Sequence, residues 1–244
     1  WSSDVCSSDL RDALTLVLAY FTVEKDKFVR RYLGAKPELL KHATTAQSYQ
    51  RIVTDLANPN QTRIVTAPID RNLLILAGPG SGKTRTIVHR CAYLLRVERV
   101  RPHAILVCCF NRSAAIELRR RLRDLVGSDA IGVTIQTYHG LALRLLGRSL
   151  TPPPGSSAPA ETPDLDRLIP DAVRLLRGER IPAGTDPDDV RDRLLAGFQH
   201  ILVDEYQDTN VAQYMWLRLL AQGSNNVCCV GDDDQSIYGW QIGR

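Results

Sequence analysis

The residues best suited to chemistry form a glycine-rich octapeptide at positions 77–84, which reads AGPGSGKT. Its spacing fits the phosphate-binding loop pattern, with Ala77 at the first small-residue position. Glycines let a backbone approach phosphate oxygens closely and direct its N–H groups at them. We expect Lys83 to reach the outer phosphates and the hydroxyl of Thr84 to ligate Mg²⁺. The expected nucleotide-binding residues are Ala77, Gly78, Pro79, Gly80, Ser81, Gly82, Lys83, Thr84 and Arg85.

The flanking sequence provides the elements that such a loop requires. Residues 73–76 form an apolar run short enough for a buried strand. After the loop, residues 85–95 carry apolar side chains at helical spacing. A strand, a glycine loop and a helix N-terminus in this order form an anion-binding site. The alternative, a glycine-rich turn that binds nothing, does not explain this context.

A second candidate segment delivers two carboxylates at the end of an apolar run. Residues 201–203 read as a strand, and Asp204 and Glu205 follow it directly. Ligands of open α/β sheets lie at the carboxyl ends of the strands. We expect Asp204 to hold the Mg²⁺ that Thr84 also contacts, and Glu205 to polarise the attacking water. An isolated Asp-Glu pair is usually only solvated, but here the combination with the loop indicates hydrolysis of a nucleoside triphosphate.

Strand and helix patterns alternate along most of the chain. Strands are expected at residues 104–110, 132–137, 199–203 and 227–230. Helices are expected at residues 112–126, 138–146 and 211–220. This alternation predicts an α/β fold with a parallel sheet covered by helices on both faces.

Composition is ordinary for a soluble globular protein, with 44% hydrophobic and 24% charged residues. A net charge of +4 permits a nucleic-acid partner without requiring one. Four of the six cysteines form the pairs Cys108-Cys109 and Cys228-Cys229 inside apolar runs, so we expect small core residues rather than metal ligands or disulfides. No run is long enough to span a membrane, and a cytoplasmic protein fits best.

The chain is expected to divide into four segments. Residues 1–9 have no period, so we expect a non-native, adaptor-derived leader, with a flexible native terminus as the alternative. Residues 10–57 predict a helical extension, and residues 58–240 the α/β lobe. Within that lobe, a Pro/Gly/Ser-rich linker opens a small helical insert at about residues 150–198. Residues 241–244 are expected to be a non-native end.

Two longer motifs indicate which class of nucleotide-binding protein this is. Residues 203–210, which read VDEYQDTN, resemble the Walker B segment of the UvrD/Rep-like superfamily 1 DNA helicases. Residues 230–240, which read VGDDDQSIYGW, resemble the third motif of the same family. Weaker similarities are FNRSAA at 110–115 and TYHG at 137–140, which match DNA-contacting motifs. This resemblance covers about residues 58–240 and implies a RecA-like P-loop lobe that binds ATP and Mg²⁺.

The resemblance also implies roles for single residues. Gln61 falls where the family has its adenine-reading glutamine, and Gln235 would sense the γ-phosphate and act with Lys83 and Glu205 in catalysis. The residues that it implies for DNA contact are Phe110, Arg112, Thr137, Tyr138, Tyr238 and Trp240. Aromatic faces stack on any base, which suits single strands; the alternative for each aromatic is a core residue. The arginines at 119–123 are expected to form only an exposed helix face.

The implied activity is that of the first lobe of an ATP-dependent DNA helicase or translocase. Its partners would be single-stranded DNA, duplex junctions and a second RecA-like lobe of the same protein, with no membrane. We expect this chain to bind ATP but not to unwind DNA, because the second lobe supplies arginines to the ATP site. Three alternatives remain: a helicase–nuclease subunit, a non-enzymatic ATP-gated DNA-binding module, and a generic P-loop ATPase. Departures from the family are Ser113 in place of a lysine, a shortened insert, and the sequence after Trp240.

Overall fold

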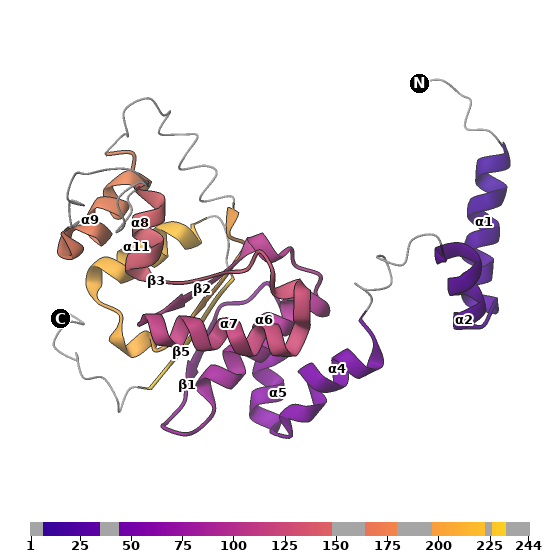
Figure 1. Ribbon diagram of the computed structural model, residues 1–244, viewed down its shortest axis with the longest axis horizontal. Helices are drawn as coiled ribbons and strands as arrows, with labels where there is room; N and C mark the ends of the chain where they lie inside the picture. Colours follow the sequence, from indigo (N-terminus) through magenta and orange to yellow (C-terminus); the bar gives the residue numbers. More distant parts are fainter. Residues whose placement is uncertain (1–6, 35–43, 148–163, 180–196, 223–225, 233–244) are drawn as a thin grey trace, which may run out of the picture. The chain divides into compact units, whose positions relative to one another are not determined.

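The computed structural model describes residues 7–34, 44–147, 164–179, 197–222 and 226–232. The chain forms two compact units, residues 1–45 and residues 46–244. Figure 1 shows the helices and strands of both, and each unit is described by itself. No helix of the described ranges is both long and apolar enough to cross a membrane.

The first unit is a short helical segment. It consists of α1 (Ser7–Thr22), α2 (Lys25–Phe28) and the π-helix η1 (Val29–Leu33). The ring of Tyr20 packs edge-on against Phe28, with centroids 5.7 Å apart. Large apolar side chains of α1 remain exposed, including Leu10, Leu14 and Phe21.

The second unit begins earlier than the sequence boundary at residue 58. It opens with α4 (Ala46–Ile52), the turn η2 (Thr54–Leu56) and α5 (Pro59–Val65). The side chains of Ile52, Val53 and Leu56 are buried in the same core cluster as α6 (Lys83–Arg96). Residues 46–57 therefore belong with the α/β lobe rather than with the preceding helices.

The lobe is built on a five-stranded sheet in the order β1-β5-β4-β2-β3. Its strands are β1 (Leu73–Leu76), β2 (Ile105–Cys109), β3 (Thr134–Thr137), β4 (His200–Val203) and β5 (Val227–Gly231). Every pairing is parallel, which confirms the predicted parallel α/β sheet. The first strand differs from expectation in its burial: β1 lies at the edge, and Leu74 and Leu76 are 65% and 62% exposed.

Helices cover both faces of the sheet (Figure 1). Side chains from alternate positions of β2 divide between two core clusters, as the pleat requires. One cluster joins the sheet to α6 and α7 (Arg112–Val126). The other joins it to α8 (Tyr138–Leu145), α9 (Leu165–Leu176) and α11 (Val211–Ala221). Short turns complete the lobe: η3 (Pro102–Ala104), η4 (Gly127–Ala130) and η5 (Tyr206–Asp208).

The cysteine pairs lie in these two clusters. Cys109 and Cys228 belong to one cluster, and Cys108 and Cys229 to the other. All four side chains are buried, as expected for small core residues. Burial raises the pKa of Cys109 to about 12, so its thiol stays protonated at neutral pH.

Candidate nucleotide-binding site

Several of the predicted site residues lie at the carboxyl-terminal ends of the strands, on one side of the sheet, because all five strands are parallel. The phosphate loop follows β1, Asp204 follows β4, and Asp232 follows β5. Phe110 follows β2, and Thr137 closes β3. The carboxyl ends of neighbouring parallel strands meet at the same edge, which is where α/β sheets bind ligands.

The phosphate loop takes a backbone conformation that depends on glycine. Gly80 and Gly82 have φ angles of +71° and +85°, in the left-handed region. Ser81 closes the turn, since its hydroxyl donates to the Gly78 carbonyl at 2.7 Å. The loop is also tied to the sheet through the Ala77 N–H, which donates to the Gly231 carbonyl at 2.9 Å. Helix α6 begins at Lys83, within the loop, so its N-terminus lies where phosphate is expected to bind.

Gln61 packs directly against this loop. Its Nε2 donates to the Ser81 carbonyl at 2.8 Å. The side chain is buried, and its Oε1 has no hydrogen-bond partner among the described residues. A buried amide oxygen without a donor is costly, and none of the described residues donates to this one. The structure thus brings Gln61 to the loop from α5, a separate helix.

Lys83 is the buried cation of the site, with 9% of the residue exposed. Its Nζ lies 3.4 Å from Asp232 Oδ2 and 3.6 Å from Glu205 Oε2. A charge this buried requires opposite charges nearby. Asp232, which is 3% exposed, was not among the predicted site residues. Its position directly after an apolar strand is the same signal that identified Asp204, and could have found it.

Asp204 and Glu205 occupy different environments. Asp204 is buried, and this desolvation, followed by the charge of Glu205, raises its pKa to about 6. Glu205 has about a third of its side chain exposed and a left-handed backbone with φ of +52°. The Glu205 N–H donates to Asp204 Oδ1 at 3.1 Å. A buried carboxylate with a raised pKa favours binding of a cation, and its hard oxygens suit Mg²⁺.

The two remaining loop predictions fall at the start of α6. Thr84 is half-buried in the first turn of this helix, next to Lys83. Arg85 is exposed, and its Nη2 donates to the Asp55 carbonyl at 2.8 Å. In this structure the guanidinium of Arg85 is thus held by η2.

The described residues that were predicted to contact DNA differ in how exposed they are. Phe110 is 39% exposed at the end of β2, and Arg112 is exposed in the first turn of α7. Thr137 caps α8, where its Oγ1 accepts from the Gly140 N–H at 3.1 Å. Tyr138 differs from expectation because it is 2% exposed and its ring lies 6.0 Å from that of Trp216. We therefore assign Tyr138 to the core, since a base has no face of this ring to stack on.

Three predicted site residues lie outside the described residues. They are Gln235, Tyr238 and Trp240.

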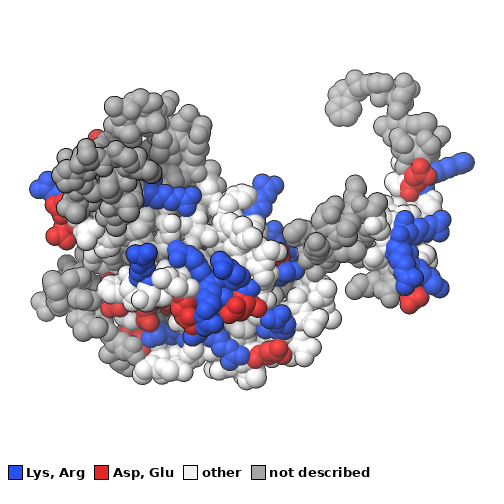
Figure 2. Space-filling view, in the orientation of Figure 1, with Lys and Arg blue, Asp and Glu red and all other residues white. Residues whose placement is uncertain are grey.

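The arginines of α7 form an exposed face with neighbouring acids, as Figure 2 shows by adjacent blue and red surfaces. Arg120 and Arg121 both pair with Glu117, at 2.8 Å and 2.7 Å. Arg120 also pairs with Asp124 at 3.2 Å. Arg119 donates to the Ile135 carbonyl. These pairs neutralise much of the positive charge, which agrees with a solvated helix face.

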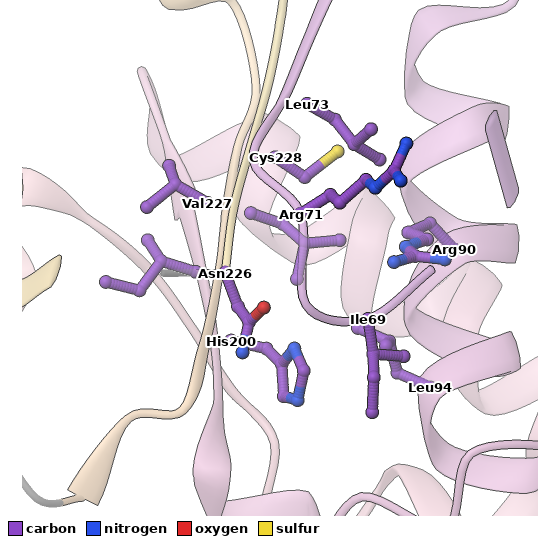
Figure 3. A pocket seen from close by; sticks show the side chains of 11 residues that line it. Ile69, Arg71, Leu73, Arg90, Leu94, His200, Asn226, Val227 and Cys228 are labelled. Carbon is purple, nitrogen blue, oxygen red and sulfur yellow. The ribbon is translucent and has the colours of Figure 1, made fainter. Parts of the chain in front are cut away.

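A small cavity lies at the amino-terminal ends of the strands, beside the starts of β4 and β5 (Figure 3). Its volume of about 10 Å³ is far below that of a nucleotide site. Buried His200 and Arg90 line it, together with Asn226. Arg90 donates to the carbonyls of Val65 and Ala67 at 2.8 Å and 2.6 Å, so its role is structural.

Comparisons with known proteins agree with this geometry. The family model for the UvrD/REP helicase N-terminal domain matches residues 57–151 and 157–244. DNA helicase II of Escherichia coli (strain K12) is 34% identical over 253 residues, covering 77% of this chain and 35% of that protein. ATP-dependent DNA helicase PcrA of Staphylococcus epidermidis (strain ATCC 35984) is 33% identical over 234 residues, covering 69% of this chain and 32% of that protein.

The chain thus spans about a third of the length of these relatives. The family match covers the parallel sheet, the phosphate loop and the carboxylates that face it. On this evidence of sequence and fold together, the chain belongs to the UvrD/REP helicase N-terminal domain family.

Proposed function

We propose that this chain is the first of two RecA-like lobes of an ATP-dependent DNA helicase or translocase, which couples Mg·ATP hydrolysis to movement on single-stranded DNA. The observation that carries the proposal is the position of Lys83. Its buried ammonium lies beside Glu205 and Asp232, at the sheet edge where the phosphate loop ends. Two of the relatives' names, DNA helicase II and ATP-dependent DNA helicase PcrA, support the same activity.

Each nucleotide-site residue has a defined task in this proposal. Lys83 binds the outer phosphates, and the loop amides bind the remaining phosphate oxygens. Thr84 and Asp204 hold Mg²⁺, which neutralises charge on the phosphates when bound. Glu205 orients and polarises the attacking water. Gln61, whose Oε1 has no partner among the described residues, accepts from the amino group of adenine.

Hydrolysis and DNA movement require more than this lobe. Phosphoryl transfer depends on positive charge delivered at the transition state, and an arginine from across a cleft is worth about 10³- to 10⁵-fold in rate. We assign that charge to a second RecA-like lobe of the same protein. The isolated chain then binds Mg·ATP and hydrolyses it slowly, without unwinding a duplex. Gln235 would report the γ-phosphate to the DNA surface, as the family resemblance implies.

The DNA side of the lobe is the same edge of the sheet, at the ends of β2 and β3. Phe110 offers a partly exposed ring, while Arg112 and Thr137 can contact phosphates. Tyr238 and Trp240 are further candidates for stacking, from the motif alone. Stacking on aromatic rings and charge attraction to phosphates give sequence-tolerant binding of single strands.

Binding of a fluorescent oligothymidine tests the DNA part of the proposal by anisotropy. We expect the 244-residue chain to bind it, with affinity that falls as salt rises. Phe110→Ala should weaken binding about tenfold, since one stacked base contributes about 1–3 kcal/mol. Phe21→Ala, which removes an exposed phenylalanine from the other unit, is the matched control. Equal affinity for both variants would contradict the assignment of Phe110.

A further inference from the structure

Four polar groups close a ring beside the phosphate loop. Lys83 Nζ lies 3.6 Å from Glu205 Oε2 and 3.4 Å from Asp232 Oδ2. Gln207 Nε2 donates to the same Glu205 oxygen at 2.7 Å. Gln207 Oε1 accepts from the backbone N–H of Asp232 at 3.0 Å, which completes the ring. The proposed function gives Gln207 no task.

The orientation of the Gln207 amide is set by its partners. A backbone N–H can only donate, so the atom facing Asp232 must be the amide oxygen. The amide nitrogen then faces the carboxylate of Glu205, which can only accept when ionised. The side chain is buried, with 7% of the residue exposed. Both hydrogen-bonding ends of this amide are therefore used, one toward β4 and one toward β5.

The end of β5 is packed closely around this amide. A Cβ added at Gly231 would lie 2.9 Å from Gln207 Oε1 and 3.2 Å from Gln207 N. Such distances leave no room for a side chain, so Gly231 allows η5 and β5 to approach. Gln207 lies in η5, two residues after Glu205. From there its side-chain amide contacts the Glu205 carboxylate.

Glu205 needs such a constraint more than its neighbour does. Asp204 is buried after a buried strand, whereas Glu205 is longer and partly exposed, on a left-handed backbone. Lys83 contacts the Glu205 carboxylate too, but Lys83 has a second task at the phosphates. The hydrogen bond from Gln207 does not depend on Lys83. It can hold Glu205 while the lysine serves the nucleotide.

From this geometry, and resting on the proposed function, we propose that Gln207 is a positioning residue for ATP hydrolysis. Its amide holds the Glu205 carboxylate in the orientation that the attacking water requires, and joins it to the end of β5. Misplacement of a catalytic group by about 1 Å can cost about 10²-fold in rate. In the sequence, Asp232 is also three residues before Gln235, the proposed γ-phosphate sensor.

Two substitutions separate the donor from the acceptor of this amide. Gln207→Glu keeps the size of the side chain and an oxygen for the Asp232 N–H, but replaces the donor to Glu205 with a like charge. Gln207→Met removes both hydrogen bonds at similar volume. Gln213→Glu is the matched control: this buried glutamine of α11 forms a capping box with Asn210, in which glutamate serves equally.

The experiment measures three quantities on the 244-residue chain. They are single-turnover hydrolysis of radiolabelled ATP with protein in excess, the Kd for Mg·ATP, and hydrogen exchange at the Asp232 amide. We expect Gln207→Glu to lower the rate by about tenfold or more, with Kd changed less than about threefold and Asp232 still protected. Gln207→Met should lower the rate and also expose the Asp232 amide to exchange. Gln213→Glu should match the wild type in all three.

Glu205→Gln separates failure of this inference from failure of the proposed function. If the wild type does not bind Mg·ATP, or Glu205→Gln keeps the wild-type rate, the proposed function fails. If Glu205→Gln loses the rate while Gln207→Glu keeps it, only the positioning role is overturned. Loss of rate, affinity and Asp232 protection together in Gln207→Glu would show a purely structural role, which also overturns the inference.

Discussion

Lys83 shows how single residues in this lobe combine burial with charge. A buried ammonium is stable only with opposite charges beside it, and Glu205 and Asp232 supply them. Two carboxylates thus face this one ammonium. In the proposed function, nucleotide phosphates would replace these carboxylates as the negative partners of Lys83. Glu205 would then be free to act on water.

His200, the first residue of β4, leads to a prediction about how stability depends on pH. Burial, and then the charge of Arg90, lower its pKa from the ordinary value of 6.5. Arg71, Asn226 and Cys228 also line the cavity around it. Below pH 6.5 the unfolded chain binds a proton that the folded protein does not. The contribution of His200 to the free energy of unfolding therefore falls as pH drops from 7 through 6.5 toward the folded pKa. Asp204, whose pKa is raised to about 6, contributes in the opposite direction over this range.

Chemical denaturation between pH 7.5 and 5 measures this dependence. We expect His200→Gln to reduce the loss of stability at low pH, at about 1.4 kcal/mol for each pKa unit by which folding lowers the pKa of His200. The dependence should not vanish, because burial also lowers the pKa of His89. A variant with an unchanged pH dependence would contradict this role for His200.

At the scale of elements, the phosphate loop depends on the conformation of Gly82. Its φ of +85° is strained for any other residue, and an added Cβ would lie 2.6 Å from Gln61 Nε2. We expect Gly82→Ala to lower the free energy of unfolding by about 1–2 kcal/mol. It should also weaken Mg·ATP binding, because Gln61 and the loop can no longer keep their present contact. Urea denaturation and nucleotide titration measure the two effects.

Gly78→Ala is the control for stability, since an added Cβ at Gly78 meets no atom within 4 Å. Its free energy of unfolding should remain near that of the wild type. The double variant Gln61→Ala/Gly82→Ala separates the two causes, because it removes the contact and leaves the backbone strain. Wild-type stability and affinity in Gly82→Ala would show that the loop does not need its left-handed residue.

The elements themselves were largely predictable from sequence, because each depends on a local pattern. Apolar runs predicted β2 and β4, and the glycine loop between an apolar run and a helical period predicted β1 and α6. The edge position of β1 was not predictable, since strand order depends on contacts far apart in the chain. Leu74 is exposed for that reason, although its neighbours in sequence are apolar.

Sequence motifs identified residues of the candidate site, but they did not predict which side chains contact one another. Lys83, Asp204 and Glu205 were expected together, and the parallel sheet brings their segments to one edge. The contacts of Asp232 and Gln207 were missed, because they depend on how β5 and η5 pack. The assignment of Tyr138 to DNA came from a motif that does not state which way its ring points. In the structure that ring belongs to the core.

At the scale of the whole molecule, this lobe represents one half of a proposed two-lobed motor. The chain matches about a third of the length of its relatives, and the match includes the whole parallel sheet. In the proposed function, one lobe alone presents the phosphate loop, the Mg²⁺ ligands and one side of a DNA groove. Closure around ATP would need the second lobe as an opposing surface. We therefore expect the isolated chain to bind ATP without moving along DNA.

Equilibrium titration of the 244-residue chain with Mg·ATP tests the central claim most directly. Calorimetry should detect binding by the wild type, and Lys83→Met should weaken it by about tenfold or more, since the lysine contacts the outer phosphates. Lys27→Met, at an exposed lysine of the other unit, controls for the substitution, and circular dichroism checks the fold. If folded Lys83→Met bound Mg·ATP as tightly as the wild type, the assignment of this edge as the nucleotide site would be contradicted.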